Sequence, residues 1–336
     1  MSLRLPALLL IAAIAVVGLV YGANNGGQRT PSQASVAAVP PPRQGHSRPA
    51  PRPVVPATLV AQPAGRLPAA VQAPATAPLA DGSVLLMGGL DSGLVSSSAI
   101  DRGRRVIGRL PVPVHDAAGA PAPGGAYLFC GGEPSQDAIV QVTASGHATR
   151  VGRLPAPASD VAAATLGGNY YVVGGYTGVQ ALSSIVEWKP GSSKGRVVAR
   201  LPVALRYAAV ASVGSEIVIA GGTDGLRASR AVYAFDPARR TVRTVARLPR
   251  PLTHSSAAAL GGIVYLIGGR DASLTSQTRR ILAIDPRRGT VRTAGTLPRG
   301  LSDVGVAPAA GGAIQAAGGR DSSGQVRSEV YRLAPH

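Results

Sequence analysis

Cysteine and aromatic residues are scarce in this chain of 336 residues. Cys130 is the only cysteine, so no disulfide can form within the chain and its stability must come from packing. Phe, Trp and Tyr together make up 4% of the sequence, whereas hydrophobic residues make up 45%. A sizeable core can therefore form, but it must be built from Ala, Val, Leu and Ile.

Negative charge is scarce as well. Asp and Glu number 16 against 34 Lys and Arg, which gives a formal net charge of +18, and Lys189 and Lys194 are the only lysines. A basic chain can bind nucleic acid, but this one has no block of about five or six like charges. It also offers few aromatic side chains to stack on bases. We therefore interpret the arginines as scattered over solvated surfaces and expect no nucleic-acid partner.

The N-terminal segment contains the one long apolar run. Residues 5–23 read LPALLLIAAIAVVGLVYGA, and Arg4 precedes them. About 20 apolar residues span a bilayer, and positive charge stays on the inner side. Residues 1–23 are therefore predicted to be a signal anchor or a signal peptide, and Tyr21 disturbs the small-residue cleavage pattern, which favours the anchor. The rest of the chain would lie outside the cytoplasm at the cell membrane, or would be secreted if this segment is cleaved.

Residues 24–56 are rich in Pro, Ala, Ser, Gln and Arg and show no periodicity, as in AAVPPPRQGHSRPAPRPVVP. This composition predicts an extended, disordered linker. The remaining residues, 57–336, are expected to form the folded domain.

Gly-Gly pairs divide that domain into repeats. Six pairs that each close a short apolar run begin at residues 88, 131, 174, 221, 268 and 318, so the successive steps are 43, 43, 47, 47 and 50 residues. Leu-Pro recurs at nearly the same period, beginning at residues 67, 110, 154, 201, 248 and 297. A regular period of this length is typical of a repeat architecture.

Each repeat contains signals for four strands. A strand of small residues, such as VAAATL at 161–166, leads through a Gly-rich tight turn to an apolar strand that ends at Gly-Gly. A third strand and a half-exposed fourth strand follow. Six such units predict an all-β fold, a six-bladed β-propeller in which the small first strands lie nearest the axis.

The two ends of the domain predict how the ring closes. The last unit stops at His336 after its third strand, whereas residues 58–68 form an unmatched strand before the first unit. AGRLP at 64–68 also matches AGTLP at 294–298. We therefore expect the N-terminal strand to complete the last blade.

The units resemble kelch repeats over roughly residues 57–336. The resemblance rests on the apolar run into Gly-Gly, on the Asp that follows it, and on strand three ending as Tyr233, Asp236 and Pro237. It implies the propeller fold of the galactose oxidase/kelch superfamily, which includes six-bladed bacterial N-acetylneuraminate epimerases. The late Trp that the family has in strand four is missing here, and Trp188 falls in strand three instead. The aspartates are Asp91, Asp224, Asp271 and Asp321.

The resemblance to galactose oxidase does not extend to its copper site. Such a site needs two histidines, two tyrosines and a Cys–Tyr crosslink, and only five histidines are present here. Cys130 lies inside a predicted strand and is interpreted as a small buried hydrophobe. We expect no metal and no cofactor.

Candidate site residues lie where each unit begins, on one predicted face around the axis. The sixth residue after each Leu of Leu-Pro forms one column, and the residue before it forms a second. Polar residues at the mouth of an Ala-lined channel suit ligand binding. The first column is Ala73, Asp116, Asp160, Tyr207, His254 and Asp303, and the second is Gln72, His115, Ser159, Arg206, Thr253 and Ser302.

Two interpretations of these columns remain open. The polar residues could bind a sugar or a cation, or the repeated aspartates could cap their own turns, which repetition favours. Arg206, Tyr207 and His254 break the repeat and are the better functional candidates. Residues after Gly-Gly that depart from their pattern extend the predicted face: Glu133, Tyr176, Arg270 and Arg320.

These observations lead to two hypotheses on function. The first is a membrane-tethered, extracytoplasmic propeller, expected to be a monomer, that binds a protein or a cell-envelope glycan. The alternative is a sugar-active enzyme, such as an epimerase or mutarotase, that uses the channel mouth, although no acid/base pair can be identified in the sequence.

Overall fold

The computed structural model describes residues 55–336, which fold into strands, turns and loops. The predicted signal anchor at 1–23 and nearly all of the predicted linker at 24–56 lie outside the described residues. Among residues 55–336, no helix has the length and apolar character needed to cross a bilayer.

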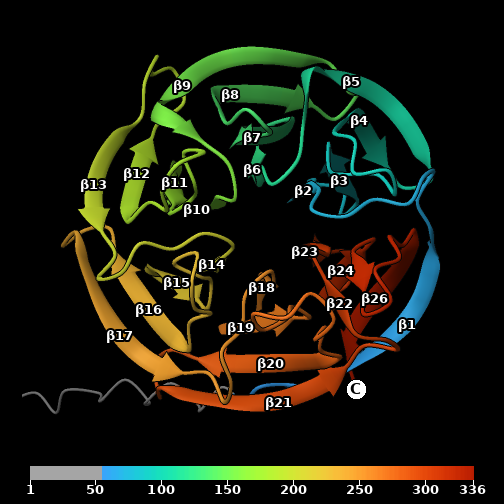
Figure 1. Cartoon of the computed structure of the whole chain (residues 1–336), viewed down its shortest axis with the longest axis vertical. Helices are drawn as coiled ribbons and strands as arrows, with labels where there is room; N and C mark the ends of the chain where they lie inside the picture. The colour runs from blue at the N-terminus through green and yellow to red at the C-terminus, as the bar shows by residue number, and fades with distance from the viewer. Residues whose placement is uncertain (1–54) are drawn as a thin grey trace, which may run out of the picture. The chain divides into compact units, whose positions relative to one another are not determined.

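Antiparallel strands form sets of four that follow one another around a central axis (Figure 1). Four sets are separate sheets, and two further sets are joined in one sheet of eight strands. The first three sets are β2 (Ala75–Pro78), β3 (Val84–Met87), β4 (Ser97–Arg102), β5 (Arg105–Val114); β6 (Ala118–Ala122), β7 (Gly125–Gly131), β8 (Gln136–Thr143), β9 (Ala148–Ala158); and β10 (Ala162–Leu166), β11 (Asn169–Val173), β12 (Ser184–Trp188), β13 (Arg196–Arg200).

The remaining sets repeat this order. The fourth and fifth sets are β14 (Ala209–Val213), β15 (Glu216–Ala220), β16 (Ala231–Asp236), β17 (Thr241–Arg247); and β18 (Ser256–Leu260), β19 (Ile263–Ile267), β20 (Arg280–Asp285), β21 (Thr290–Thr296). The last set is β23 (Gly305–Ala309), β24 (Ala313–Ala317), β26 (Glu329–Pro335) and β1 (Leu59–Arg66), with a short pair β22 (Leu301–Ser302) and β25 (Arg320–Asp321) beside it.

The first strand of each set lies nearest the axis, where β2, β6, β10, β14, β18 and β23 contact one another around the ring. These strands are made of small residues, as in Ala162–Leu166 (AAATL), because larger side chains would collide where the sets converge. The fourth strands form the circumference, and β17 is largely exposed along its length. The predicted small inner strand and half-exposed outer strand are both confirmed.

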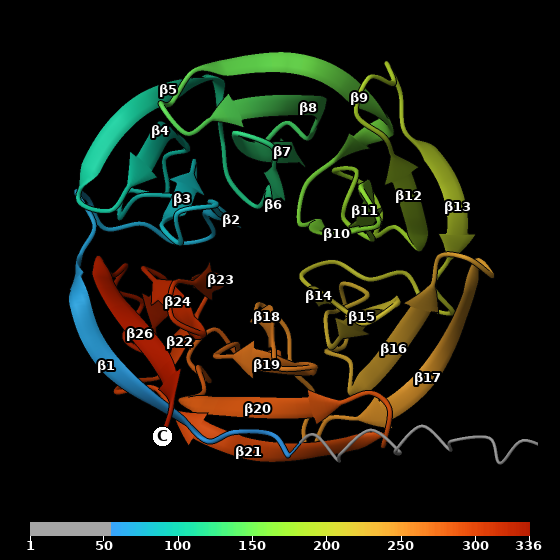
Figure 2. The same ribbon diagram turned by 180° about the vertical axis from the view of Figure 1, so that it is seen from behind.

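The N-terminal strand completes the last set. β1 pairs antiparallel with β26, with Leu59 opposite Pro335 and Arg66 opposite Glu329. Its first residues also pair in parallel with β21, so β1 joins the fifth set to the last (Figure 2). This pairing is the one that the sequence predicts.

Apolar side chains fill the seams between neighbouring sets. Six buried clusters are each shared by two adjacent sets of the described residues. Aromatic rings gather at the seam of the second and third sets, where Tyr127 lies 4.9 Å from both Tyr170 and Trp188 between ring centroids. Cys130 is buried in the same cluster, as predicted.

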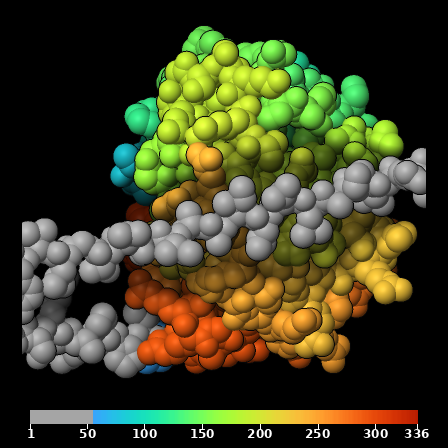
Figure 3. Space-filling view, turned by 90° about the vertical axis from the view of Figure 1, so that its left-hand side faces the viewer, coloured from blue at the N-terminus to red at the C-terminus, as the bar shows by residue number. Residues whose placement is uncertain are grey.

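In side view, the colours change gradually from green to orange as successive sets follow around the ring (Figure 3).

The Gly-Gly pairs lie where the second strand of each set meets the loop that leads to the third strand. Gly174 has φ +63°, and a Cβ there would lie 2.2 Å from the carbonyl oxygen of Leu205. Gly175 has φ +110°, and its N–H donates to that same carbonyl at 2.8 Å. Only glycine combines this backbone conformation with such a close approach. The same approach to a carbonyl oxygen recurs at Gly88, Gly221, Gly268 and Gly318, whereas in the second set Cys130 has φ +46° and a Cβ at Gly132 would meet nothing closer than 3.6 Å.

Candidate functional site

Six equivalent residues surround the mouth of the central channel with an unusual backbone conformation. Each precedes an inner strand and has a φ between +52° and +58°, a left-handed value that is uncommon for residues with a Cβ. Asp and His are enriched in this conformation, whereas Tyr and Ala adopt it at a cost of roughly 1–2 kcal/mol. We call this set the mouth ring: Ala73, Asp116, Asp160, Tyr207, His254 and Asp303.

A closed circle of backbone hydrogen bonds holds the mouth ring. The N–H of each member donates to the carbonyl oxygen of the corresponding residue in the preceding set, over 2.8–3.3 Å. The N–H of Ala73 donates to Asp303 at 2.8 Å and thereby closes the circle. The conformation therefore repeats because the backbone uses it to link every set to the next.

This circle corrects the interpretation of the aspartates as turn caps. In residues 55–336, no backbone N–H donates to the carboxylates of Asp116, Asp160 or Asp303. Their partners are side chains: the Tyr207 hydroxyl, the Arg206 guanidinium and the Ser302 hydroxyl respectively. The backbone has the repeated structural role, whereas the three carboxyl groups line the inner cavity and contact side chains.

Two cavities meet at the mouth ring. The inner cavity, of about 160 Å³, is lined by all six members and by small residues that begin the inner strands, such as Ala75 and Ala118. The outer cavity, of about 140 Å³, is lined by five of the six members together with Arg270, Arg320 and Gln277. Together they offer the space for a small ligand with polar groups on one side and alanines on the other.

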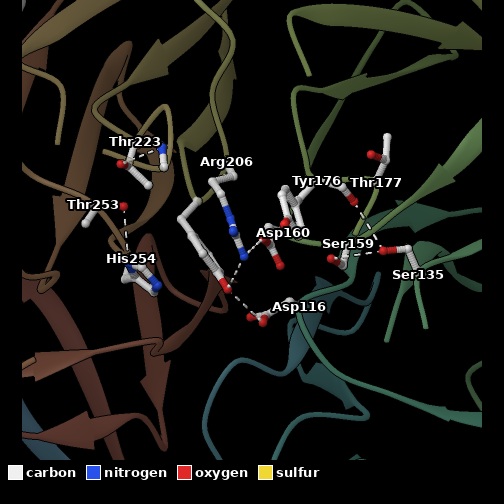
Figure 4. A network of polar contacts seen from close by, with 12 residues as sticks. Asp116, Ser135, Ser159, Asp160, Tyr176, Thr177, Arg206, Thr223, Thr253 and His254 are labelled. Carbon is white, nitrogen blue, oxygen red and sulfur yellow. Dashed lines mark hydrogen bonds and ion pairs between the residues drawn. The ribbon is translucent and has the colours of Figure 1, made fainter. Parts of the chain in front are cut away.

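Arg206 organises one side of the ring (Figure 4). Its guanidinium forms an ion pair with Asp160, whose side chain is only 3% exposed, and donates to the Tyr207 hydroxyl at 3.2 Å. That hydroxyl donates in turn to Asp116 at 3.3 Å. The guanidinium also lies 3.9 Å from the ring centroid of Tyr176, a cation–π contact. Three sets of strands thus contribute to one network.

His254 forms the other side of the ring. Its imidazole stacks on the Tyr207 ring with centroids 3.7 Å apart and planes inclined by 23°. The Arg270 guanidinium lies 3.0 Å from Nε2, and arginine can only donate, so Nε2 accepts and Nδ1–H donates to the Thr253 hydroxyl at 3.1 Å. Burial, with the charges of Arg270 and Arg206, lowers the pKa of His254 to about 2. The imidazole is therefore neutral near pH 7.

Burial raises the pKa of the carboxyl groups in the mouth ring, whereas it lowers the pKa of His254. It raises the pKa of Asp303 to about 6, although the Ser302 hydroxyl donates to it at 2.6 Å and Arg270 and Arg320 favour its charge. Burial also raises the pKa of Asp116, and the charges of Asp160 and Asp303 add to the effect. The pKa of Asp160 is raised for the same first reason, and Arg206 opposes it. The ring therefore contains carboxyl groups that bind protons more readily than exposed ones.

The other predicted residues have separate locations. His115 is half-buried beside Asp116, with Nε2 3.8 Å from its carboxylate and Nδ1 2.8 Å from the Ser96 hydroxyl, and burial lowers its pKa. Glu133 is exposed and lines neither cavity. Arg270 and Arg320 line the outer cavity, as described above.

Some lining residues were missed. Leu90, Leu94, Leu274 and Gln277 all line the outer cavity and were not among the candidates. All four lie in the loops between second and third strands, which vary in length and sequence from unit to unit. Only their position after Gly-Gly could have indicated them.

The aspartates that follow Gly-Gly hold those loops. Asp91 accepts from the N–H groups of Gly93 and Val95, and Asp224 accepts from those of Leu226 and Arg227. Asp271 and Asp321 accept from backbone N–H groups of their own loops in the same way. These four aspartates therefore stabilise the loops between the second and third strands of their sets. In residues 55–336, no group of three or more His, Cys, Asp or Glu is arranged to hold a metal ion.

The described chain enters the ring on the face opposite the mouth ring. β17 runs outermost in its set and leads through Leu248 to His254 of the mouth ring. β1 occupies the equivalent place in the last set and leads through Leu67 to Ala73. Its first residue, Leu59, therefore lies at the far face, and there the His336 N–H donates to the Thr58 carbonyl at 3.0 Å.

Comparison with known proteins agrees with this architecture. The kelch motif family model matches residues 204–249, and the solved structure entitled "Structure of YjhT" superposes with a TM-score of 0.68 at 14% sequence identity, covering 80% of this chain and 96% of that one. No curated protein sequence matches. Sets of four antiparallel strands around an axial channel define a β-propeller. The matched motif and the recurring Gly-Gly units resemble those of kelch propellers.

Proposed function

We propose that this protein is a six-bladed, membrane-tethered propeller outside the cytoplasm whose mouth ring binds a saccharide of the cell envelope. The observation that carries the proposal is the stack of Tyr207 on His254, which stands among the carboxyl groups of Asp116, Asp160 and Asp303. Carboxylates accept hydrogen bonds from sugar hydroxyls. The cavities that meet at the ring suit one small polar ring rather than a broad protein surface.

The position of the N-terminal strand supports presentation of this site. The predicted anchor at residues 1–23 and the predicted linker at 24–56 precede β1 in the sequence, and β1 begins on the face away from the mouth ring. A chain of 33 residues, such as 24–56, reaches about 30 Å as a coil and about 100 Å in polyproline conformation. The mouth ring would then remain open to the cell envelope.

A glycan array on residues 55–336 tests the proposal, because every strand pairing described above lies within this segment. We expect binding to one class of saccharide, and a loss of at least tenfold in affinity for Arg206→Ala and His254→Ala. Arg247→Ala is the matched control, since this exposed side chain lies on the outer strand β17. If the protein binds no saccharide on the array but binds another protein, and the same variants weaken that binding, the mouth ring would be assigned to a protein partner instead.

Asp303 also favours a second candidate, a sugar-active enzyme of the epimerase or mutarotase kind. Its pKa of about 6 lies close to pH 7, so the Asp303 carboxyl could take up and return a proton beside the mouth-ring cavity. Proton NMR of each bound sugar would detect interconversion of its anomers or epimers. Conversion that Asp303→Asn abolishes while binding persists supports an enzyme, and binding without any conversion supports a binding module.

A further inference from the structure

A further cavity lies on the same face as the mouth ring, away from the axis, between the fourth and fifth sets. It has a volume of about 1150 Å³. Its floor includes Leu252 and Leu282, which are 8% and 5% exposed and belong to the apolar cluster that joins these two sets. Leu226, 90% exposed, lies on one wall, and the loop of residues 271–278 forms the other. We call this cavity the rim groove.

The walls of the rim groove are loops stabilised by their own hydrogen bonds. The loop between β19 and β20 covers residues 268–279 and is two residues longer than its counterpart at 221–230. Asp271 holds it by accepting from the Ser273 N–H at 2.8 Å and from the Ser276 hydroxyl at 2.5 Å. Asp224 ties the N–H groups of Leu226 and Arg227 in the facing loop. The groove is therefore built into the fold.

Four arginines border the rim groove without forming a salt bridge within residues 55–336, and only the longer-range charges of Asp224 and Asp271 act on Arg227 and Arg250. In residues 55–336, no carboxylate lies within ion-pairing distance of these guanidinium groups, and the one acid of the lining, Asp271, is engaged within its own loop. An anion would be attracted here and could receive paired N–H donors. The four arginines are Arg227, Arg250, Arg279 and Arg280.

The apolar floor and the arginine border together define the ligand. A bound peptide would need partners for its backbone, but β20 is already paired on both sides, with β19 and β21, and offers no free edge. An acyl chain has no polar group along its length and leaves nothing unsatisfied on an apolar floor. We propose that the rim groove binds a long-chain acyl carboxylate, with the chain along Leu252 and Leu282 and the carboxylate at Arg250 and its neighbours.

Photolabelling of the full chain tests this proposal directly. The probe is a dodecanoate analogue that carries a diazirine near the end of its chain. After irradiation, we expect mass spectrometry to locate the label in residues 226–228, 249–252 and 271–282. Unlabelled dodecanoate should compete, and octanoate should compete at least tenfold less well, because each buried methylene strengthens binding by up to about fourfold. Dodecyltrimethylammonium, with the same chain and a positive head, should not compete.

Two variants with matched controls distinguish binding in the rim groove from nonspecific binding of the probe to the protein surface. Leu226→Ser and Arg250→Glu should each reduce labelling at least fivefold, because the first removes a wall and the second reverses a border charge. Val179→Ser is the control for the first, since Val179 is an 87% exposed tip of the equivalent loop in the third set, outside the groove. Arg200→Glu, on the exposed outer strand β13, is the control for the second.

Labelling spread evenly over the surface would overturn the proposal, as would equal competition by the cationic amphiphile or equal losses in the control variants. Displacement of the label by an acidic peptide, but not by dodecanoate, would assign the groove to a protein partner. None of these outcomes depends on the mouth ring. Asp303→Asn should leave labelling unchanged, so failure here is distinguishable from failure of the saccharide proposal.

Discussion

The backbone N–H of Ala73 donates to the carbonyl oxygen of Asp303 at 2.8 Å, which joins the first set of strands to the last. This bond is one of six equivalent bonds, and the other five link neighbours along the chain. It works together with β1, whose pairing with β26 closes the ring at the circumference. The ring is therefore closed twice, once at the channel and once at the outer edge.

Deletion of residues 55–66 should destabilise the whole propeller. The loss of β1 removes the outermost strand of the last set and uncovers Leu333, which lies in the buried cluster beside Leu59. We expect the thermal midpoint to fall by at least 10 °C, or the protein to become insoluble. Deletion of residues 24–54, outside the ring, is the control. A truncated chain that melts with the intact one would show that β1 is not needed for closure.

Gly174→Ala and Gly167→Ala form a matched pair, since their φ angles are +63° and +60°. Each should lose roughly 1 kcal/mol from the left-handed backbone. At Gly174 the new Cβ would also meet the Leu205 carbonyl at 2.2 Å, whereas at Gly167 it meets nothing within 4 Å. Urea denaturation should therefore show an additional loss of roughly 2 kcal/mol or more for Gly174→Ala. Equal losses would contradict our explanation of the repeated pair.

Much of this arrangement could be predicted from the sequence because it repeats. The period, the order of strands, the small inner strand and the pairing of β1 all follow from local patterns in several copies. The left-handed backbone conformation of the mouth ring could not be predicted. Ala73, Tyr207 and His254 adopt it, although positive φ is normally signalled by glycine. Glu133 was expected beside the mouth cavities because, like Tyr176, it follows Gly-Gly and departs from the pattern of the other units. In the second set, however, only residues 132–135 separate β7 from β8, and Glu133 remains exposed.

The rim groove was also beyond sequence reasoning. It arises from two loops in different units, and its volume depends on how far apart their walls are held. No single repeat contains that information.

Removal of Arg206 should be costly because it leaves Asp160 without its ionic partner while that side chain is 3% exposed. We expect Arg206→Ala to lower the free energy of unfolding by about 3–5 kcal/mol at pH 7. The double variant Arg206→Ala/Asp160→Asn should recover a large part of the loss, because no buried charge then remains. Urea denaturation of Arg206→Ala, Asp160→Asn and the double variant measures the coupling between the two side chains. If the losses of the two single variants simply add in the double variant, the two side chains are not coupled.

Asp303 should make stability depend on pH in a defined direction. Its pKa rises from 3.8 to about 6 on folding, so the folded state binds the proton more tightly between these values. Stability contributed by this group is therefore greatest below about pH 4 and falls as the pH rises through 6, by about 3 kcal/mol in total. Asp303→Asn should lack this component, so the difference in stability between wild type and variant should change with pH over this range.

Asp101, whose pKa burial also raises to about 6, contributes with the same sign and remains in both proteins. The measurement is therefore the difference between two unfolding curves recorded from pH 4 to pH 7. A difference that does not change over this range would exclude a raised pKa for Asp303.

His254 should remain neutral well below the pH at which an ordinary histidine takes up a proton. Its pKa of about 2 results from burial and from the nearby guanidinium groups of Arg270 and Arg206. We expect its imidazole carbon resonances to stay constant between pH 8 and pH 4. In Arg270→Ala the pKa should rise, because one of the two cations is removed. Protonation of His254 near pH 6 in the wild type would contradict the lowered pKa.

The hydrogen bond from His336 to Thr58 brings the end of the chain to the start of the described ring, on the face away from the mouth ring. A short covalent link between these two positions would turn residues 58–336 into a circle. New ends could then be opened in a turn on that same far face, such as the one between β16 and β17, without cutting a strand. A circular permutant of this kind would test whether the ring depends on where its chain starts, while the binding face stays the same.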